Sequence, residues 1–158
     1  MPRDDNGNLV SYAQALRATV EEAIVADQTG IDVIALGEHH RHEFAISSPE
    51  TVLAGIATRT ENIKLASGVT VLSSDDPVRV FQRFATIDAH SNGRAEVIHG
   101  RGSFTESFHL FGYDLADYEI LFEEKIDLFH KLLDEKPVTW QGTTRAPLQD
   151  ADVFPKTE

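Results

Sequence analysis

The strongest constraint on the fold of this chain is an alternation of strand-like and helical segments. Apolar, strand-like runs open near residues 32, 63 and 95, a period of about 31 residues. Strands that alternate with helices in this way form parallel sheets with right-handed crossovers. The period matches a (β/α)₈ barrel, in which roughly 250 residues are shared among eight units. Doubly wound sheets show the same rhythm. The pattern therefore predicts an α/β fold, and spacing alone leaves these two architectures open.

Capping signals predict where three helices begin. They are Ser11 with Gln14, Ser48-Pro49 and Asp76-Pro77. Ser and Asp side chains accept the free N–H groups of a first helical turn, and proline at the first position has no donor to lose. Asp76 is therefore interpreted as a cap, and the neighbouring Asp75 as a solvated carboxylate.

The remaining elements are predicted from apolar patterns. Strands are expected at 33–36, 63–72 and 94–99, a short helix around 104–110, a long helix from about 117 to 136, and a small hairpin or edge strand within 138–144. One domain is expected over residues 1–145. The polar tail 146–158 is expected to be loop or disordered.

About three parallel βα units, a long helix and a small hairpin cannot close an eight-stranded barrel, because closure pairs every strand edge. The sequence therefore predicts a partial TIM barrel, as a fragment or a partner-dependent half. Its open strand edges and exposed apolar helix faces would favour dimerisation.

The composition excludes several classes of function. With 14 Lys and Arg against 26 Asp and Glu, the net charge of −12 would repel nucleic acids and anionic membranes. The absence of Cys excludes disulfides, thiolate nucleophiles and thiolate metal sites. Residues 1–10 are polar and acidic, and no apolar run approaches the roughly 20 residues of a membrane helix. A cytoplasmic protein without a nucleic-acid or membrane partner is expected.

Three polar segments are expected to face one mouth of the fold. Reactive groups of parallel α/β proteins gather where strands run into the following loops. That rule selects residues 37–43, 67–77 and 100–103. In the middle segment, Thr70 and Ser73 could line a pocket.

The first of these segments, GEHHRHE, is the densest in titratable groups. Histidine can act as an acid or base near neutral pH, and an adjacent carboxylate can orient it. For His40, His42 and Glu43 a solvated polar loop is the preferred interpretation. A metal site is disfavoured, because neighbours in sequence rarely converge on one ion without helical spacing.

The third segment places Arg101 between two glycines at a strand end. The backbone can approach a ligand closely there, and a guanidinium can bind phosphate or carboxylate. A tight turn that carries a surface arginine is the alternative.

Together these segments resemble the bacterial-luciferase-like, flavin-dependent oxidoreductases. The stretches that carry the resemblance are ADQTGIDVIALGEHH, IKLASGVTVLSSDDPVRVFQRFATIDAHSNGRAEVIHGRGSF and FGYDLADYEILFEEKIDLFHKLL. The EHH junction, the DPVR helix start and the S-x-GR-x-E strand ending in GRG occur in the family's order and spacing. The resemblance implies a TIM barrel that binds reduced FMN, or F420 in sister members, at its carboxyl mouth.

The resemblance also implies roles for single residues. His39 becomes the candidate acid or base beside the flavin and substrate, with Glu38 as the second catalytic candidate. A non-prolyl cis peptide bond is implied between Gly68 and Val69, under the flavin ring.

Further implied contacts concern the cofactor phosphate and the dimer. Arg101 matches a position that contacts the phosphate, and Gly102 and Ser103 would offer backbone donors. The helices at 51–60 and 78–90 would form a homodimer interface.

The implied activity is that of a two-component flavin monooxygenase. A flavin reductase would use NAD(P)H to reduce FMN, and reduced FMN with O₂ would oxidise a small organic substrate. F420-dependent hydride transfer is one alternative, and a non-catalytic fragment or interaction subunit is another. In a full-length version, His39→Ala is predicted to lower turnover more than flavin binding.

Overall fold

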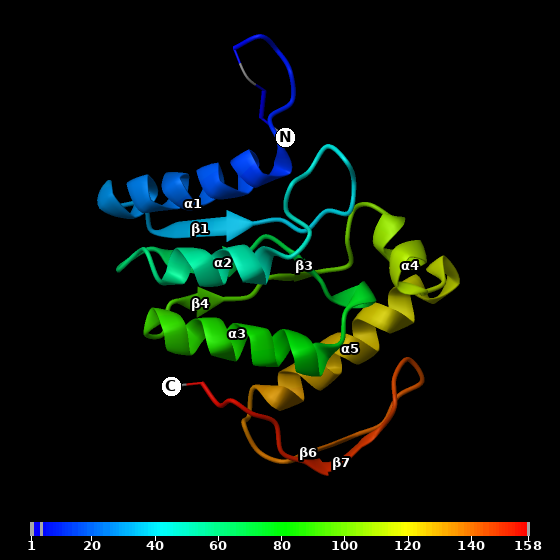
Figure 1. Cartoon of the computed structure of the whole chain (residues 1–158). Coiled ribbons are helices and arrows are strands. Elements are labelled where there is room, and N and C mark those ends of the chain that lie inside the picture. The colour runs from blue at the N-terminus through cyan, green and yellow to red at the C-terminus, as the bar shows by residue number, and fades with distance from the viewer. Residues whose placement is uncertain (1, 4, 158) are drawn as a thin grey trace.

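Helices and strands alternate along the chain in the computed structural model, as the sequence period predicts (Figure 1). The structure describes residues 2, 3 and 5–157. Residues 1 and 4 of the segment 1–145, and residue 158 of the segment 146–158, lie outside the described residues. The elements are α1 (Tyr12–Gln28), β1 (Val33–Leu36), α2 (Pro49–Ala57), β2 (Lys64–Ser67), β3 (Thr70–Val71), η1 (Leu72–Ser74), α3 (Pro77–Ser91), β4 (Ala95–Glu96), β5 (His99–Gly100), α4 (Glu106–Phe111), η2 (Leu115–Asp117), α5 (Tyr118–Leu132), β6 (Val138–Trp140) and β7 (Leu148–Ala151).

The strands β1, β2 and β4 form a parallel sheet in that order, and β3 pairs in parallel with β5. The strands expected at 63–72 and 94–99 are therefore each divided in two. At the break, the side chain of Ser67 replaces a backbone partner in the strand pairing. Its hydroxyl donates to the C=O of Ile98 at 3.2 Å and accepts from the N–H of Ile98 at 3.1 Å. Both strands continue past the break and carry the chain to one end of the sheet.

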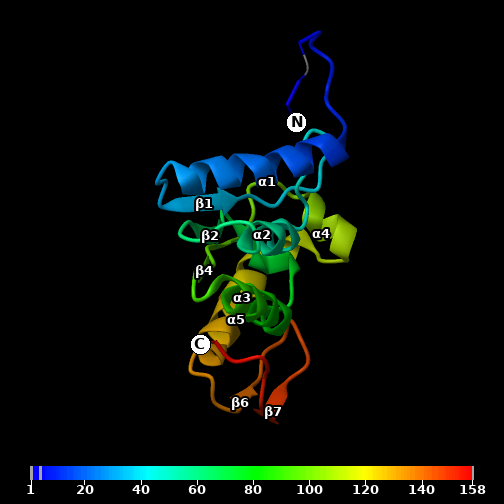
Figure 2. The same cartoon turned by 60° about the vertical axis from the view of Figure 1, so that its left-hand side comes forward.

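The helices α1, α2 and α3 lie side by side along the β1-β2-β4 sheet (Figures 1 and 2). The core lies between these layers, where Leu53, Ile56 and Leu65 have no exposed surface. Helix α5 packs against α3 and η1. Among the residues that the structure describes, no helix combines the length and apolar character needed to cross a membrane.

The helix starts are confirmed, and two details of their caps are corrected. Ser11 forms a capping box, and the Asp76 carboxylate accepts from the N–H groups of the first turn of α3. Ser48 makes no capping hydrogen bond, since its hydroxyl bonds with side chains of the following turn. Asp75 is paired rather than solvated, because Arg83 reaches back along α3 and contacts both of its carboxylate oxygens at 2.6 Å.

The tail beyond residue 145 is not wholly loop, because β7 lies in it and pairs antiparallel with β6. The predicted strand at 138–140 is confirmed, but the chain returns later than expected. The carboxylate of Glu124 accepts from the backbone N–H and hydroxyl groups of Thr143 and Thr144 at 2.7–2.9 Å. These bonds hold Thr143 and Thr144 in a turn, so the second strand forms only at Leu148.

Candidate active site at the strand ends

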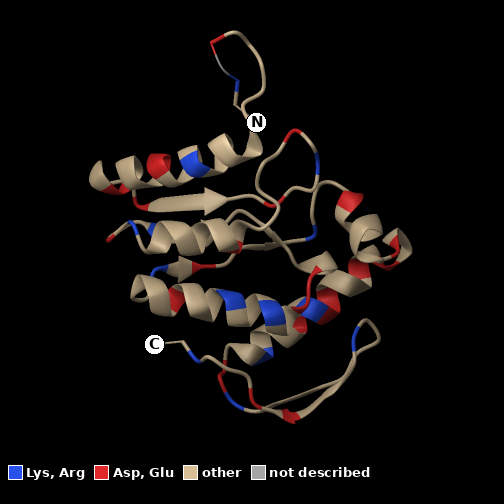
Figure 3. Cartoon of the chain, viewed as in Figure 1, with Lys and Arg blue, Asp and Glu red and all other residues tan. Residues whose placement is uncertain are grey.

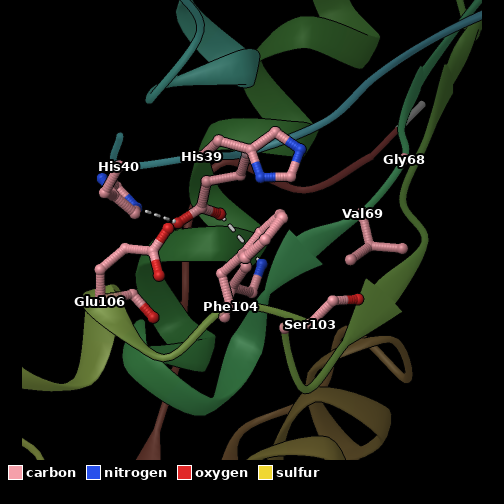
Figure 4. A pocket seen from close by; sticks show the side chains of 11 residues that line it. His39, His40, Gly68, Val69, Ser103, Phe104 and Glu106 are labelled. Atoms are coloured by element: carbon pink, nitrogen blue, oxygen red, sulfur yellow. Dashed lines mark hydrogen bonds and ion pairs between the residues drawn. The ribbon is translucent and has the colours of Figure 1, made fainter. Parts of the chain in front are cut away.

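A cavity of about 180 Å³ lies at the carboxyl ends of the strands (Figure 4). It is lined by Glu38, His39, His40, Gly68, Val69, Val71, Gly102, Ser103, Phe104, Glu106 and Ser107. Residues of all three polar segments that the sequence selects therefore meet at one place. The contributions of Phe104 and helix α4 were not predicted, because a short loop and helix carry no periodic signal.

His39 lines this cavity beside Phe104 (Figure 4) and also contacts the ring of Phe44. Its imidazole stacks on Phe44 at 4.0 Å between ring centroids and meets the ring of Phe104 edge-on at 5.3 Å. The backbone N–H of His39 donates to the C=O of Ile46 at 3.0 Å. The loop after β1 thus folds back on itself and presents the imidazole to the cavity.

Glu38 joins the ends of two strands. One carboxylate oxygen, Oε2, accepts from the N–H of Val71 at 2.9 Å, and Oε1 lies 2.8 Å from Nε2 of His40. The side chains of His40 and Glu38 are only 9% and 10% exposed. The prediction that His40 is solvated is therefore wrong, because the folded loop places it against Glu38 and Phe111. His42, with a side chain 80% exposed, is solvated as expected.

Gly68 and Val69 are joined by a cis peptide bond, which confirms the geometry implied by the resemblance. Glycine is required on the facing strand, since a Cβ at Gly100 would lie 2.5 Å from Cγ2 of Val69. Gly102 has a φ of +84°, and a Cβ there would lie 2.9 Å from Cγ1 of Val71. Larger residues at these two positions would displace the cavity wall.

Arg101 is the predicted site residue that does not line the cavity. Its guanidinium pairs with Glu119 at 3.1 Å and lies over the ring of Phe122, 4.7 Å from the centroid. Thr70 and Ser73 are buried, but they do not line the cavity either. The backbone of the GRG segment contributes to the cavity while the arginine side chain turns toward α5.

Charged residues are dispersed over several helices and loops (Figure 3). Within the described part of the chain, no group of three or more His, Asp or Glu side chains could hold a metal ion. The cavity itself carries the carboxylates of Glu38 and Glu106 beside two histidines.

His99, on the strand that leads into the GRG segment, has a strongly perturbed pKa. Its ring meets Phe129 edge-on at 4.2 Å, and its two ring nitrogens are buried without a hydrogen-bond partner among the described residues. Burial, and secondarily the charge of His130, lower the pKa of His99 from 6.5 to about 4. The folded state therefore keeps this imidazole neutral.

Replacing His99 with Phe is expected to make the protein more resistant to acid. The unfolded chain takes up a proton at His99 below pH 6.5, whereas the folded chain does so only near a pKa of about 4. Stability is thus lost as the pH falls through this window, by about 2 kcal/mol at pH 5. Urea unfolding at pH 7.5 and pH 5 measures the effect. His42→Phe should retain the wild-type pH dependence, and an unchanged dependence in His99→Phe would contradict the assignment.

The fold and the cavity define part of a (β/α) barrel with a site at the carboxyl ends of its strands. The family model described as luciferase-like monooxygenase matches residues 3–158. The chain belongs to the luciferase-like monooxygenase family.

Several curated relatives are monooxygenases of greater length. Limonene 1,2-monooxygenase of Rhodococcus erythropolis is 36% identical over 126 residues, which are 79% of this chain and 32% of that protein. The 4-hydroxyprotoasukamycin monooxygenase of Streptomyces nodosus subsp. asukaensis is 37% identical over 115 residues, 72% of this chain and 31% of that protein. The oxygenase component of flavin-dependent trigonelline monooxygenase from Acinetobacter baylyi is 31% identical over 101 residues, 61% of this chain and 28% of that protein. The chain spans about a third of the length of these relatives.

Solved structures confirm the partial barrel. Monooxygenase RslO1 from Streptomyces bottropensis superposes with a TM-score of 0.85 at 27% identity, over 93% of this chain and 45% of that one. The oxygenating constituent of 3,6-diketocamphane monooxygenase from Pseudomonas putida, solved in complex with FMN, shares the fold at a TM-score of 0.80 and 23% identity, over 89% of this chain and 40% of that one. An F420-dependent secondary alcohol dehydrogenase shares the fold at a TM-score of 0.77 and 22% identity, over 90% of this chain and 46% of that one.

Proposed function

We propose that this chain forms the His39 side of the site of a flavin-dependent monooxygenase, which uses reduced FMN and O₂ to oxidise a small organic substrate. The cavity at which His39, the Gly68–Val69 peptide and the GRG backbone meet carries the proposal. The flavin-dependent relative from Acinetobacter and the FMN complex of the camphane enzyme support it. An F420-dependent neighbour has the same fold, so hydride transfer with F420 is the second candidate.

The residues of the cavity fit part of a flavin. Val69, Val71 and Phe104 give it apolar surfaces for a flat ring. The hydroxyl oxygen of Ser107 is buried there and has no hydrogen-bond partner among the described residues, so it could bond with a ligand. The volume of about 180 Å³ is below the roughly 300 Å³ of the smallest clefts that hold drug-sized ligands. The rest of the cofactor would therefore lie outside this cavity.

Each candidate residue then has a defined task. Bound reduced FMN would supply the electrons that reduce O₂. His39 would hold or release a proton at the edge of the cavity, and the N–H groups of Gly102 and Ser103 would bond with the cofactor. Arg101 would contact the phosphate only by exchanging Glu119 for it, because that carboxylate is its present partner.

The partners follow from the same chemistry. A flavin reductase would supply reduced FMN at the expense of NAD(P)H, which suits a cytoplasmic location. Helices α2 and α3, which hold most of residues 51–60 and 78–90, lie side by side on one face, and we propose this face as a homodimer interface.

Titration of the chain with FMN, followed by absorbance and melting temperature, tests the proposal. Saturable binding is expected to stabilise the fold by about 2.7 kcal/mol at a hundredfold excess over Kd. Ser103→Trp, which fills the cavity, should abolish the shift, and Thr105→Trp, in the same loop but outside the cavity lining, should retain it. Stabilisation by F420 alone would favour hydride transfer. No response to either cofactor would favour a non-catalytic, interaction role.

A further inference from the structure

A second cavity, of about 240 Å³, lies beside the candidate active site. It is lined by Glu38, His40, Ser47, Ser48, Glu50, Ser74, Asp75, Arg83 and Phe111. Glu38 and His40 line both cavities. Their side chains therefore form a wall that the two cavities share.

The two side chains in this wall are joined to each other and fixed in place (Figure 4). Nε2 of His40 lies 2.8 Å from Oε1 of Glu38. The other carboxylate oxygen is held by the N–H of Val71, and the imidazole rests edge-on against Phe111 at 5.1 Å. An ionised carboxylate only accepts hydrogen bonds, so the shared proton is assigned to Nε2 of His40. The other ring nitrogen, Nδ1, remains able to accept a proton.

The other charged groups around the wall differ between the two sides. They are His39 and Glu106 in the first cavity, and Glu50, Asp75 and Arg83 in the second. Arg83 pairs with Glu50 at 2.7 Å and with Asp75 at 2.6 Å, so each of these two carboxylates already has an ion-pair partner. The joined carboxylate and imidazole of Glu38 and His40 are the titratable groups that reach both sides.

We propose that Glu38 and His40 conduct protons between the second cavity and the cofactor cavity, an inference that rests on the proposed function. Reduction of O₂ to hydrogen peroxide takes up two electrons and two protons. The anion of reduced FMN supplies both electrons and one proton, so the protein must admit one more. A proton binds Nδ1 of His40, the Nε2–H bond breaks, and that proton forms an O–H bond with Oε1 of Glu38. Glu38 then passes it into the cofactor cavity, and neither side chain is oxidised or reduced.

The rate at which O₂ reoxidises bound, reduced FMN tests this step without a known substrate. His40→Gln keeps an N–H donor for Glu38 but cannot carry a proton, so it is expected to slow reoxidation about 100-fold while FMN affinity is retained. His42→Gln, which alters an exposed histidine of the same loop, should react at the wild-type rate. Imidazole should partly restore the rate of His40→Gly. A wild-type rate in His40→Gln would overturn the proposal.

The protonated ring nitrogen of His40 provides a readout that needs no cofactor. Long-range ¹H–¹⁵N NMR of the free chain, with His40→Gln to assign the resonances, is expected to show the proton on Nε2. In Glu38→Ala the fraction of His40 protonated at Nε2 should fall toward that of a histidine without a hydrogen-bond partner. A proton on Nδ1 in the unaltered chain would overturn the inference. Failure of the chain to bind FMN would reject the proposed function, and the NMR result would still decide whether Glu38 holds the His40 proton.

Discussion

Replacing Arg94 with alanine is expected to lower the free energy of unfolding by about 3 kcal/mol or more. The guanidinium donates to the C=O groups of Ala57, Thr60, Ile63 and Ser91 at 2.7–3.0 Å. These carbonyls lie at the end of α2, in the loop before β2 and at the end of α3. One side chain therefore connects two βα units by hydrogen bonds. Its loss leaves several half-buried carbonyls without a partner, which costs more than the net value of the bonds themselves.

Urea denaturation measures this effect. Arg94→Lys should recover little stability, because a single ammonium group cannot reach carbonyls on several sides. Arg79→Ala, on the exposed face of α3, should change stability by no more than about 0.5 kcal/mol. A loss in Arg94→Ala no larger than in Arg79→Ala would show that the network contributes nothing to the fold.

In a full-length version of the proposed enzyme, replacing His39 with alanine is expected to lower turnover about 100-fold, with a much smaller change in FMN affinity. The imidazole lies at the cavity edge between Phe44 and Phe104, where it would exchange protons with bound molecules. The truncation removes a proton carrier but leaves the Gly68–Val69 peptide and the GRG backbone in place. Turnover is measured as O₂ consumption with reduced FMN supplied by a reductase, and affinity by titration.

The exposed histidine of the same loop provides the control for this variant. His42→Ala should change neither turnover nor FMN affinity, because its side chain is 80% exposed and does not line the cavity. Equal losses of turnover and affinity in His39→Ala would assign His39 to cofactor binding instead. Unchanged turnover would remove it from the reaction.

Local signals in the sequence were sufficient for the helix starts. The capping box at Ser11 and the Asp76-Pro77 start of α3 depend on residues within one helical turn, so both appear in the structure as predicted. The strand ends that line the cavity were also predicted, since a parallel α/β fold brings them to one edge. The cis bond at Gly68–Val69 was predicted from the family resemblance and not from a local signal.

Contacts between residues distant in sequence decided the position of the second hairpin strand and the orientation of the polar side chains near the cavity. Glu124 holds Thr143 and Thr144 from across the chain and so moves the hairpin partner into the tail. His40 is buried by its pairing with Glu38 and its contact with Phe111, and Arg101 is turned from the cavity by Glu119.

The alternation of strands and helices along the sequence thus determined the fold class and the edge of the sheet at which the candidate site lies. It could do so because the hydrophobic period and the helix caps depend on residues only a few positions apart. Only the tertiary structure decided which polar side chains face the cavity and which are paired elsewhere. The physical reason is that hydrogen bonds and ion pairs of long side chains form with whatever partner the folded chain brings within about 3 Å. Sequence spacing does not encode those partners.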